Sequence, residues 1–405
     1  MLYQFSFKNF KSYKSETVFD MRAENIDEFK DSLIIDKNDT KLLPVSVIYG
    51  PNAGGKSGLI EALVCLISIV LQPRKSLEID RIDGNKRIFA YYNSVIPYKF
   101  DDNSINEPTE FQIFFSTKLR EYKYNLKVKD KAILEESLEK KEFNAKKSAK
   151  IFSRKKDKIS LGEILKKANV SINVNENIPY LTFLSITNKI EIIDDVIGWF
   201  KNITAINYAK EAFEGIIALY DDDFKDLFIK ILNSMSIDIF DYRIEEKENG
   251  MINIFTKHKN NDKIYELNFE EESEGTKKVF SIIPHILVSL AYGGLLILDE
   301  LDAKLHTKLL KYIIMIFKNR KLNSNNAQLI FTSQDIMTMS NEIFRRDEIW
   351  YACKNENNES EIYSLYDIRD ENGEHIRANA AFGRQYLNGK YGADPYLDKI
   401  KINHL

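Results

Sequence analysis

The stretch Gly50-Pro51-Asn52-Ala53-Gly54-Gly55-Lys56-Ser57 decides the fold, and it follows directly on the apolar run Leu42–Tyr49. That run is rich in β-branched residues and predicts a buried strand, while the apolar residues from Leu59 to Leu71 predict a buried helix. Glycines permit a turn in which successive backbone N–H groups point inward and form a nest for phosphate oxygens. A strand, a glycine-rich loop and a buried helix in this order are typical of a phosphate loop.

The loop matches the pattern Gly-x-x-x-x-Gly-Lys-Ser completely, so its residues predict a nucleotide site. Lys56 supplies a point charge for the β- and γ-phosphates, and the hydroxyl of Ser57 is a ligand for Mg²⁺. The positive end of the helix that begins near Ser57 also favours phosphate binding. We therefore expect ATP and Mg²⁺ as ligands, with the nucleotide bound by Asn52, Ala53, Gly54, Gly55, Lys56 and Ser57.

A second motif, Leu295-Leu296-Ile297-Leu298-Asp299-Glu300, ends an apolar strand with two carboxylates. The carboxyl ends of strands are where α/β sheets bind their ligands. We expect Asp299 to hold the magnesium through water and Glu300 to polarise the attacking water as a general base. Apolar strands that end in Asp-Glu also occur in purely structural roles, and the phosphate loop is what favours the catalytic interpretation.

A third motif lies just before this strand. Asp299 lies 243 residues after Lys56, which is too far for a compact Ras-like unit. Upstream of it, Glu272–Lys278 begins an apolar helix in which Ser273 suits the N-cap and Gly275 allows another group to approach closely. Such a helix start favours a phosphate supplied from outside, while an ordinary capped helix is the alternative.

Together these motifs resemble ABC-type ATPase heads of the SMC and RecF kind, and above all the stand-alone bacterial ATPases related to the OLD family. The resemblance spans about residues 1–135 and 260–400. Phe7–Tyr13 looks like the first strand of these proteins, whose aromatic residues approach the nucleotide. Leu301-Asp302 looks like their D-loop, which crosses the dimer interface.

The resemblance also implies a homodimer or a higher homo-oligomer. In an ABC dimer, the element that corresponds to Ser273 and Gly275 contacts the γ-phosphate held by the phosphate loop of the other copy. The C-terminal stretch Arg384–Pro395 is similar to the tail of the stand-alone ATPases, and the resemblance gives it no chemical role.

One position departs from the family pattern. Members usually carry a histidine after the strand Leu329–Thr332, where it contacts the γ-phosphate, and Gln334 stands at that place here. Glutamine can hydrogen-bond a phosphate but cannot become cationic. We therefore expect slow hydrolysis, or an ATP-stabilised dimer that turns over rarely.

The expected fold is α/β: an ABC-type P-loop ATPase head with a mixed sheet flanked by helices, an antiparallel β lobe and an inserted helical subdomain. The head is expected in two parts, residues 1–135 and 251–405, with a mainly helical insert at residues 136–250. The insert has no sustained heptads, so it cannot form a long coiled coil.

A lysine-rich stretch lies within the expected insert. The stretch Lys140–Lys158 contains nine lysines and arginines against two acidic residues, Glu142 and Asp157. Such a cluster could bind the phosphate backbone of a nucleic acid. A solvated loop is the alternative interpretation.

The composition bounds the remaining possibilities. Of the 405 residues, 44% are apolar and 29% are charged, which is typical of a globular protein, and the net charge of −3 gives no general attraction to nucleic acid or to anionic membranes. The longest apolar stretch, Ala62–Leu71, is shorter than the roughly 20 residues of a membrane span. Two cysteines, Cys65 and Cys353, have no metal-ligand spacing, so we expect a cytoplasmic protein without membrane contact.

The biological role implied by the resemblance is that of a bacterial anti-phage or abortive-infection component. Its ATPase would sense invasion and control a separate effector, a nuclease or a toxin, because the hundred or so residues after Glu300 leave no room for the nuclease module of OLD-type proteins. The alternatives are a RecF-like or SMC-like DNA-binding ATPase of DNA repair and a nucleotide-dependent scaffold with little turnover.

Overall fold

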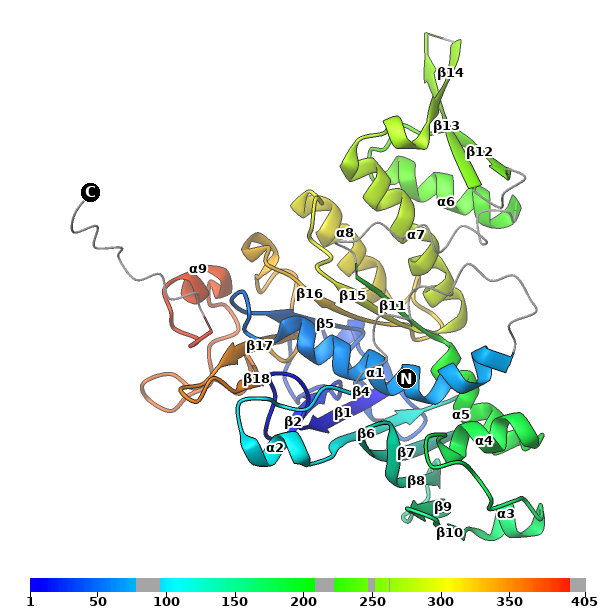
Figure 1. Ribbon diagram of the computed structural model, residues 1–405. Coiled ribbons are helices and arrows are strands. Elements are labelled where there is room, and N and C mark those ends of the chain that lie inside the picture. Colours follow the sequence, from blue (N-terminus) through cyan, green and yellow to red (C-terminus); the bar gives the residue numbers. More distant parts are fainter. Residues whose placement is uncertain (78–94, 208–221, 247–251, 262, 394–405) are drawn as a thin grey trace, which may run out of the picture.

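Two large β-sheets enclose helix α1 (Lys56–Leu77) between them (Figure 1). The computed structural model describes residues 1–77, 95–207, 222–246, 252–261 and 263–393. Leu63 and Leu66 of α1 belong to the same core as Phe5 of one sheet and Ile297 of the other. Because α1 contacts both sheets, it is apolar on nearly all sides.

The first sheet has six strands in the order β11-β15-β16-β5-β17-β18, and its pairs are parallel except for β17–β18. Its strands are β5 (Val45–Tyr49), β11 (Ile203–Asn207), β15 (Leu295–Asp299), β16 (Gln328–Thr332), β17 (Ile349–Lys354) and β18 (Ser360–Ser364). Helices α7 (Glu274–Tyr292) and α8 (Thr307–Lys318) cover the face opposite α1. Both faces are therefore buried, which explains the continuous apolar runs of β5, β15 and β16.

The second sheet is antiparallel and has seven strands in the order β10-β9-β8-β7-β6-β1-β2. These are β1 (Leu2–Lys8), β2 (Thr17–Asp20), β6 (Thr109–Ser116), β7 (Arg120–Lys129), β8 (Ala132–Glu142), β9 (Ala149–Lys155) and β10 (Lys158–Leu161). Shorter elements accompany it: β3 (Ile34–Ile35), β4 (Lys41–Leu42), α2 (Asp102–Asn106), α3 (Glu163–Lys167), α4 (Tyr180–Thr187) and α5 (Glu191–Lys201). This sheet is the expected antiparallel lobe, and the fold is the expected ABC-type ATPase head.

A smaller three-stranded sheet leads into α7. It consists of β12 (Asp241–Glu246), β13 (Ile252–Asn260) and β14 (Lys263–Asn268), and α6 (Asp222–Ser234) packs beside it (Figure 1). Single turns of 3₁₀-helix occur at η1 (Lys30–Ser32), η4 (Phe269–Glu271), η5 (Ile336–Thr338) and η6 (Arg346–Glu348). The last described helix is α9 (Phe382–Leu387), which lies near the carboxyl ends of the parallel strands.

The prediction of a mainly helical insert at residues 136–250 is wrong for the first part of that range. Strand β8 runs across residue 136, and β9 and β10 continue the antiparallel sheet. The buried residues Leu138 and Phe152 are cross-strand partners in the core, and the neighbouring pair Glu136 and Arg154 is buried on the same face, while Lys150 and Lys155 are exposed. The second part of the expected helical insert is also interrupted by β11, which joins the six-stranded sheet beside β15.

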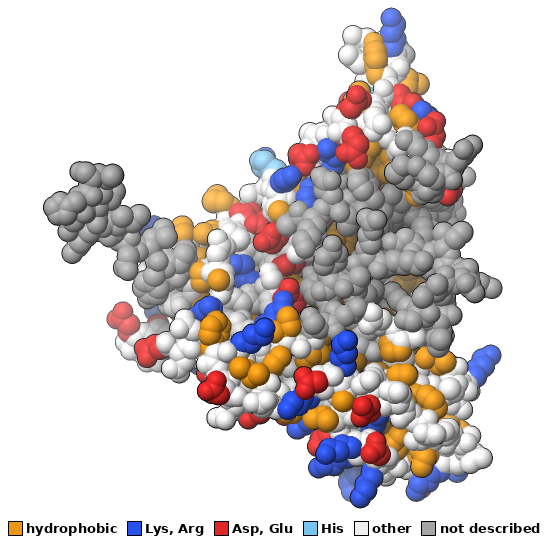
Figure 2. Space-filling model, in the orientation of Figure 1, with side chains coloured by type: hydrophobic (Ala, Val, Ile, Leu, Met, Phe, Trp, Pro, Cys, Tyr) orange, Lys and Arg blue, Asp and Glu red, His pale blue; other side chains and the backbone are white. Residues whose placement is uncertain are grey.

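Most of the lysine-rich stretch lies in strands, at the end of β8, in β9 and at the first residue of β10, so the solvated-loop interpretation is wrong there. It holds for residues 143–148, an irregular connection in which Lys146 and Lys147 are exposed. Several cations of the stretch form ion pairs: Lys140 with Glu142 (2.7 Å), Lys141 with Glu121 (2.8 Å) and Lys155 with Glu135 (3.5 Å). Figure 2 shows acidic side chains among the basic ones at this lower end of the molecule. Its charge is therefore partly neutralised within the sheet itself.

Among the described residues, one helical stretch is long and apolar enough to cross a membrane. It is Lys56–Pro73 of α1, and 72% of it is buried inside the protein. The position of α1 between two sheets accounts for its apolar character.

Candidate nucleotide site

The phosphate loop requires glycine at three positions. A Cβ atom at Gly50 would lie 2.0 Å from the carbonyl oxygen of Ala352 on β17, and one at Gly54 would lie 2.5 Å from the same oxygen. At Gly55, where φ is +119°, it would lie 2.7 Å from the hydroxyl oxygen of Tyr13. The loop therefore rests directly on the backbone of β17, which is possible only without side chains.

Lys56 begins α1 and folds back over the loop. Its Nζ donates to the carbonyl oxygens of Gly50 (2.7 Å) and Pro51 (3.0 Å). Burial lowers the pKa of this amine, while the carboxylates of Asp299 and Glu300 oppose that shift. A partly buried ammonium that is bonded to carbonyl oxygens can exchange them for phosphate oxygens.

Asp299 lies at the centre of a small polar network. The Ser57 hydroxyl donates to its Oδ1 at 3.2 Å, and the Thr332 hydroxyl donates to the same atom at 2.7 Å. The side-chain amide of Asn207 donates to Oδ2 at 3.4 Å. A hydroxyl and a carboxylate at hydrogen-bond distance form an oxygen donor set that fits Mg²⁺.

Glu300 follows in the left-handed region, with φ 58°. Its backbone N–H donates to the Thr332 hydroxyl at 2.7 Å, so that hydroxyl joins both acidic residues. Non-glycine residues in this region cost about 1–3 kcal/mol and persist where the surroundings hold them. The strained turn leads the chain straight from β15 into Leu301 and Asp302.

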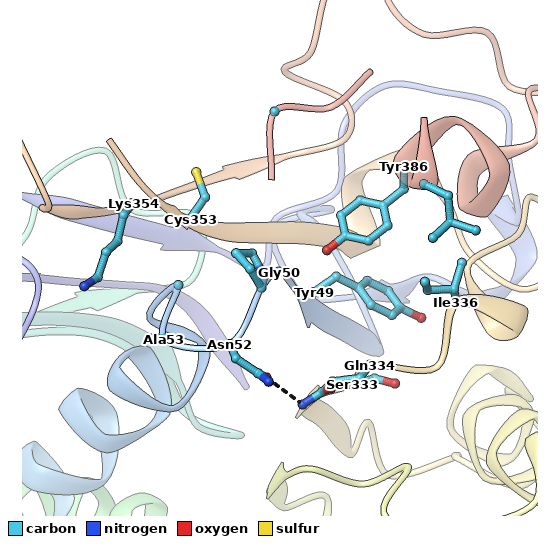
Figure 3. A pocket seen from close by; sticks show the side chains of 14 residues that line it. Tyr49, Gly50, Asn52, Ala53, Ser333, Gln334, Ile336, Cys353, Lys354 and Tyr386 are labelled. Carbon is cyan, nitrogen blue, oxygen red and sulfur yellow. Dashed lines mark hydrogen bonds between the residues drawn. The ribbon is translucent and has the colours of Figure 1, made fainter. Parts of the chain in front are cut away.

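Gln334 connects the phosphate loop with Asp302. Its backbone N–H donates to Oδ2 of Asp302 at 2.9 Å, and its side-chain amide donates to Oδ1 of Asn52 at 3.3 Å (Figure 3). Burial raises the pKa of Asp302. The structure thus places Gln334, which we call the switch residue because it stands where related ATPases carry a γ-phosphate-contacting histidine, against the phosphate loop.

Ser273 caps helix α7. Its side-chain oxygen accepts from the N–H of Thr276 at 3.1 Å, and the residue is exposed. Glu274 forms ion pairs with Lys277 (2.9 Å) and with Lys304 (2.8 Å), and these cations lower its pKa to about 2. The start of α7 lies beside the three-stranded sheet and apart from the start of α1 (Figure 1).

A model of the family described as "AAA domain, putative AbiEii toxin, Type IV TA system" matches residues 45–340. The chain belongs to this AAA-domain family. The match begins at β5 and runs past Gln334, so it includes both acidic residues after β15 and the whole phosphate loop.

Two solved structures are similar in fold to this AAA-domain protein. One is an SMC head bound to the C-terminal winged-helix domain of ScpA, with 14% identity, a TM-score of 0.42 and coverage of 90% of this chain and 97% of that chain. The other is the Smc head of Pyrococcus furiosus with an extended coiled coil, bound to the C-terminal domain of ScpA, with 13% identity, a TM-score of 0.39 and coverage of 90% and 96%. A search of curated proteins gave no match.

A pocket of about 540 Å³ borders the phosphate loop of this AAA domain. Its walls come from the loop, the switch, β17 and the C-terminal segment, and it is lined by Tyr49, Gly50, Pro51, Asn52, Ala53, Gly54, Ser333, Gln334, Ile336, Cys353, Lys354, Tyr386, Leu387 and Gly392 (Figure 3). Lys56 and Ser57 lie outside this lining. The pocket therefore shares the first part of the phosphate loop, Gly50–Gly54, and does not include its end at Lys56 and Ser57.

One contact of the AAA-domain site was missed in the sequence, and a second was expected only as an approach of the Phe7–Tyr13 segment. Asn207 reaches Asp299 from the end of β11, a segment expected to be helical, although the run Ile203-Thr204-Ala205-Ile206 has the β-branched character of a strand. Tyr13 donates its hydroxyl proton to the carbonyl oxygen of Gly55 at 2.9 Å. The aromatic N-terminal segment therefore reaches the loop through this residue.

Proposed function

We propose that this AAA-domain protein binds ATP with Mg²⁺ and hydrolyses it, with each ATP enclosed between two copies of the chain. The observation that carries the proposal is the hydrogen-bonded connection from Ser57 through Asp299 and Thr332 to Glu300. It joins the phosphate loop to the two carboxylates that the chemistry requires. A purely structural loop has no need of this connection.

Each residue has a role that follows from its position. Lys56 exchanges its carbonyl partners for β- and γ-phosphate oxygens, and the loop N–H groups bind the remaining oxygens. Ser57 and Asp299 would hold magnesium, which neutralises charge on the phosphates when bound. Glu300 accepts a proton from the attacking water, which forms a bond to the γ-phosphorus as the bond to the β–γ bridging oxygen breaks.

The second copy would contribute Ser273 and Gly275 to the nucleotide site of the first copy. Ser273 is exposed at a helix start, where backbone N–H groups favour an anion. Lys304, two residues after Asp302, forms an ion pair with Glu274, so the helix start at Ser273–Gly275 and the D-loop are joined in one surface. We propose that this surface meets the phosphate loop of the partner copy.

We further propose that the ATPase is the sensor of a defence system and controls a separate toxin or nuclease. The family description, which names a toxin and a type IV toxin–antitoxin system, supports this role. A cytoplasmic location fits two free, buried cysteines, Cys65 and Cys353. The ion pairs within Lys140–Lys158 do not favour a nucleic-acid site there, whereas the neutral Gln334 favours a nucleotide-dependent scaffold with slow turnover as the second candidate.

The first test is ATP retention in equilibrium dialysis. Wild-type protein is expected to retain ATP in the presence of Mg²⁺, Lys56→Ala is expected to lose about a hundredfold or more in affinity, and the exposed Lys308→Ala on α8 serves as the matched control. Equal absence of retention in wild type and Lys56→Ala would refute the proposal.

The second test is the dimer. Glu300→Gln is expected to retain ATP, to lose turnover by about 10²-fold or more, and to form an ATP-dependent dimer in size-exclusion chromatography. Adding Ser273→Arg to that variant is expected to abolish the dimer while ATP binding by each copy persists. A dimer that is unaffected by Ser273→Arg would contradict the enclosed-ATP arrangement.

The effector is tested through the neighbouring open reading frames. We expect one of them to encode a protein that arrests growth when it is expressed alone and that is neutralised by this chain. Neutralisation that persists in Glu300→Gln would favour the scaffold, and ATP turnover stimulated by DNA would favour DNA repair instead.

A further inference from the structure

The C-terminal clamp, defined as residues Phe382–Ala393, is fixed to β17 and β18 by tyrosines. The ring of Tyr386 stacks on Tyr351 of β17, with centroids 5.5 Å apart and an interplanar angle of 11°. The ring of Tyr391 also lies 5.5 Å from that of Tyr351, and the Tyr363 hydroxyl donates to the carbonyl oxygen of Tyr391 at 2.6 Å. This contact is specific in both packing and hydrogen bonding.

The clamp also closes on itself. The Tyr386 hydroxyl donates to the carbonyl oxygen of Ala393 at 2.9 Å, and the Tyr391 hydroxyl donates to the side chain of Gln385 at 2.7 Å. Gly389 and Gly392 adopt φ values of 73° and 72°, which turn the chain between these contacts. The clamp is thus a small ordered unit with its own internal bonds.

The first part of the clamp contacts η5 and Met339, which follow Gln334 in the chain. The N–H of Gly383 donates to the carbonyl oxygen of Met339 at 3.0 Å. A Cβ atom at Gly383 would lie 2.7 Å from the carbonyl oxygen of Ile336 and 2.9 Å from its Cγ2. Ile336 begins η5 two residues after Gln334, so the clamp packs against the backbone that directly follows this glutamine.

The tyrosines of the clamp contact Tyr351 on β17, the strand that supports the phosphate loop. Tyr351 is followed by Ala352, whose carbonyl oxygen is the surface on which Gly50 and Gly54 rest. The clamp therefore packs against the supports of both the loop and the switch. In Figure 3, Tyr386 lies across the pocket from the Asn52–Gln334 hydrogen bond.

We propose that the C-terminal clamp is a positioning element for the nucleotide site: Tyr386 positions the phosphate loop through β17, and Gly383 positions Gln334 through η5. Neither residue is a catalytic residue, because each acts through a neighbouring element. This role for the C-terminal clamp rests on the proposed function, since the clamp would act on ATP affinity and turnover.

The test uses two clamp variants and two matched controls in the full chain. Tyr386→Leu removes the stacked ring, and Gly383→Ala introduces a methyl group against η5. Gly198→Ala on α5 adds a methyl group where no atom lies within 4 Å, and Tyr366→Leu removes a ring that stacks on His375 at 4.2 Å. For each protein the ATP dissociation constant, kcat, KM and thermal midpoint are measured.

Tyr386→Leu is expected to raise the dissociation constant of ATP about tenfold, and Tyr386→Phe, which keeps the ring, is expected to restore most of the affinity. Gly383→Ala is expected to lower kcat about tenfold with the dissociation constant within about twofold of wild type, because small displacements of positioned groups reduce rates strongly. The two controls are expected to match wild type in affinity and in kcat. A purely structural clamp would lower the thermal midpoint and leave the affinity of the folded protein unchanged.

The outcomes separate this proposal from the proposed function. If wild type does not retain ATP, the proposed function fails and the clamp proposal fails with it. If wild type retains ATP and the clamp variants match it in affinity and turnover, the clamp proposal alone is wrong. If wild type retains ATP without measurable turnover, the ATP dissociation constant of Tyr386→Leu tests the clamp proposal. A dissociation constant equal to that of wild type overturns it.

Discussion

Lys56 in the phosphate loop and Lys318 in the core are both buried lysines, at 8% and 4% exposure, and they differ in their partners. Both amines donate to backbone carbonyl oxygens, Lys56 to those of Gly50 and Pro51 and Lys318 to that of Ile343 at 2.7 Å, but Lys318 also donates to the carboxylate of Glu348 at 2.6 Å. Burial lowers the pKa of both amines. A carbonyl partner can be exchanged for a phosphate without leaving a buried charge alone, and a buried carboxylate cannot. The partner therefore distinguishes a binding lysine from a structural one.

The structural lysine belongs to a larger buried ionic network. Arg345 is fully buried and forms an ion pair with Asp347 at 2.7 Å, and Asp347 also accepts from the backbone N–H of Glu24 at 2.8 Å. The Arg345 side chain donates to the carbonyl oxygen of Glu24 at 3.0 Å. This network ties the segment after β2 to the start of β17, and in the part of the chain that the structure describes none of these bonds involves the phosphate loop.

The largest expected effect is on stability. Lys318→Met leaves Glu348 buried without its cation, so we expect a loss of about 3–5 kcal/mol in the free energy of unfolding. Lys56→Met is expected to change that free energy by less than about 1 kcal/mol, because it removes only bonds to backbone carbonyls. Urea denaturation measures both, with the exposed Lys311→Met on the same helix as Lys318 as control.

Equal losses in Lys318→Met and Lys56→Met would break the comparison between the two lysines. A Lys318→Met variant as stable as wild type would show that the core carboxylate finds another partner or a proton at little cost.

The loop and the strand before Asp299 were predictable because their information is local. A glycine pattern fixes the loop within eight residues, and four apolar residues fix the strand β15. The two lysines were not distinguishable in the sequence. The partner of Lys318 lies 30 residues away, and only the tertiary structure brings Glu348 to it.

The errors in the prediction of the insert have a similar cause, because they too depend on tertiary contacts. In β9, Ile151 and Phe152 are buried among lysines that face outward, so high charge concealed a strand. The five residues of β11 lie between stretches with helical periodicity, and only their pairing with β15 makes them a strand. For that reason Asn207, whose position follows from that of β11, was not predicted as a residue of the site.

A third base, His285 in α7, is only half-buried by solvent exposure, and its desolvation lowers its pKa from 6.5 to about 4. Its folded pKa lies below the unfolded value, so its contribution to stability is complete above about pH 6.5 and is lost as the pH falls toward 4. We expect a loss of about 3 kcal/mol across this window, at roughly 1.4 kcal/mol for each unit of pKa difference. Urea denaturation at pH 7 and pH 5 is expected to show a smaller pH dependence in His285→Leu than in wild type.

The control for His285 is His306→Asn, which keeps a side-chain acceptor at the N-cap of α8, where the His306 ring accepts from the N–H of Lys308 at 3.1 Å. It is expected to retain the wild-type pH dependence. Identical pH dependence in His285→Leu and wild type would mean that His285 is protonated in the folded protein, and that partial burial without a carboxylate partner does not suppress its charge.

The smallest expected effect is at Gln334, whose side chain has a neutral partner, Asn52, at 3.3 Å. Gln334→His introduces a group that can carry charge, and hydrogen bonds from a charged donor are about twice as strong as neutral ones. We expect the steady-state rate to rise about tenfold, with more gain at pH 6 than at pH 8, and ATP affinity to stay unchanged. Gln334→Asn, which shortens the neutral amide, is expected to give no gain. An unchanged rate in Gln334→His would assign slow turnover to another step, and the lack of a cation at the switch would then not explain it.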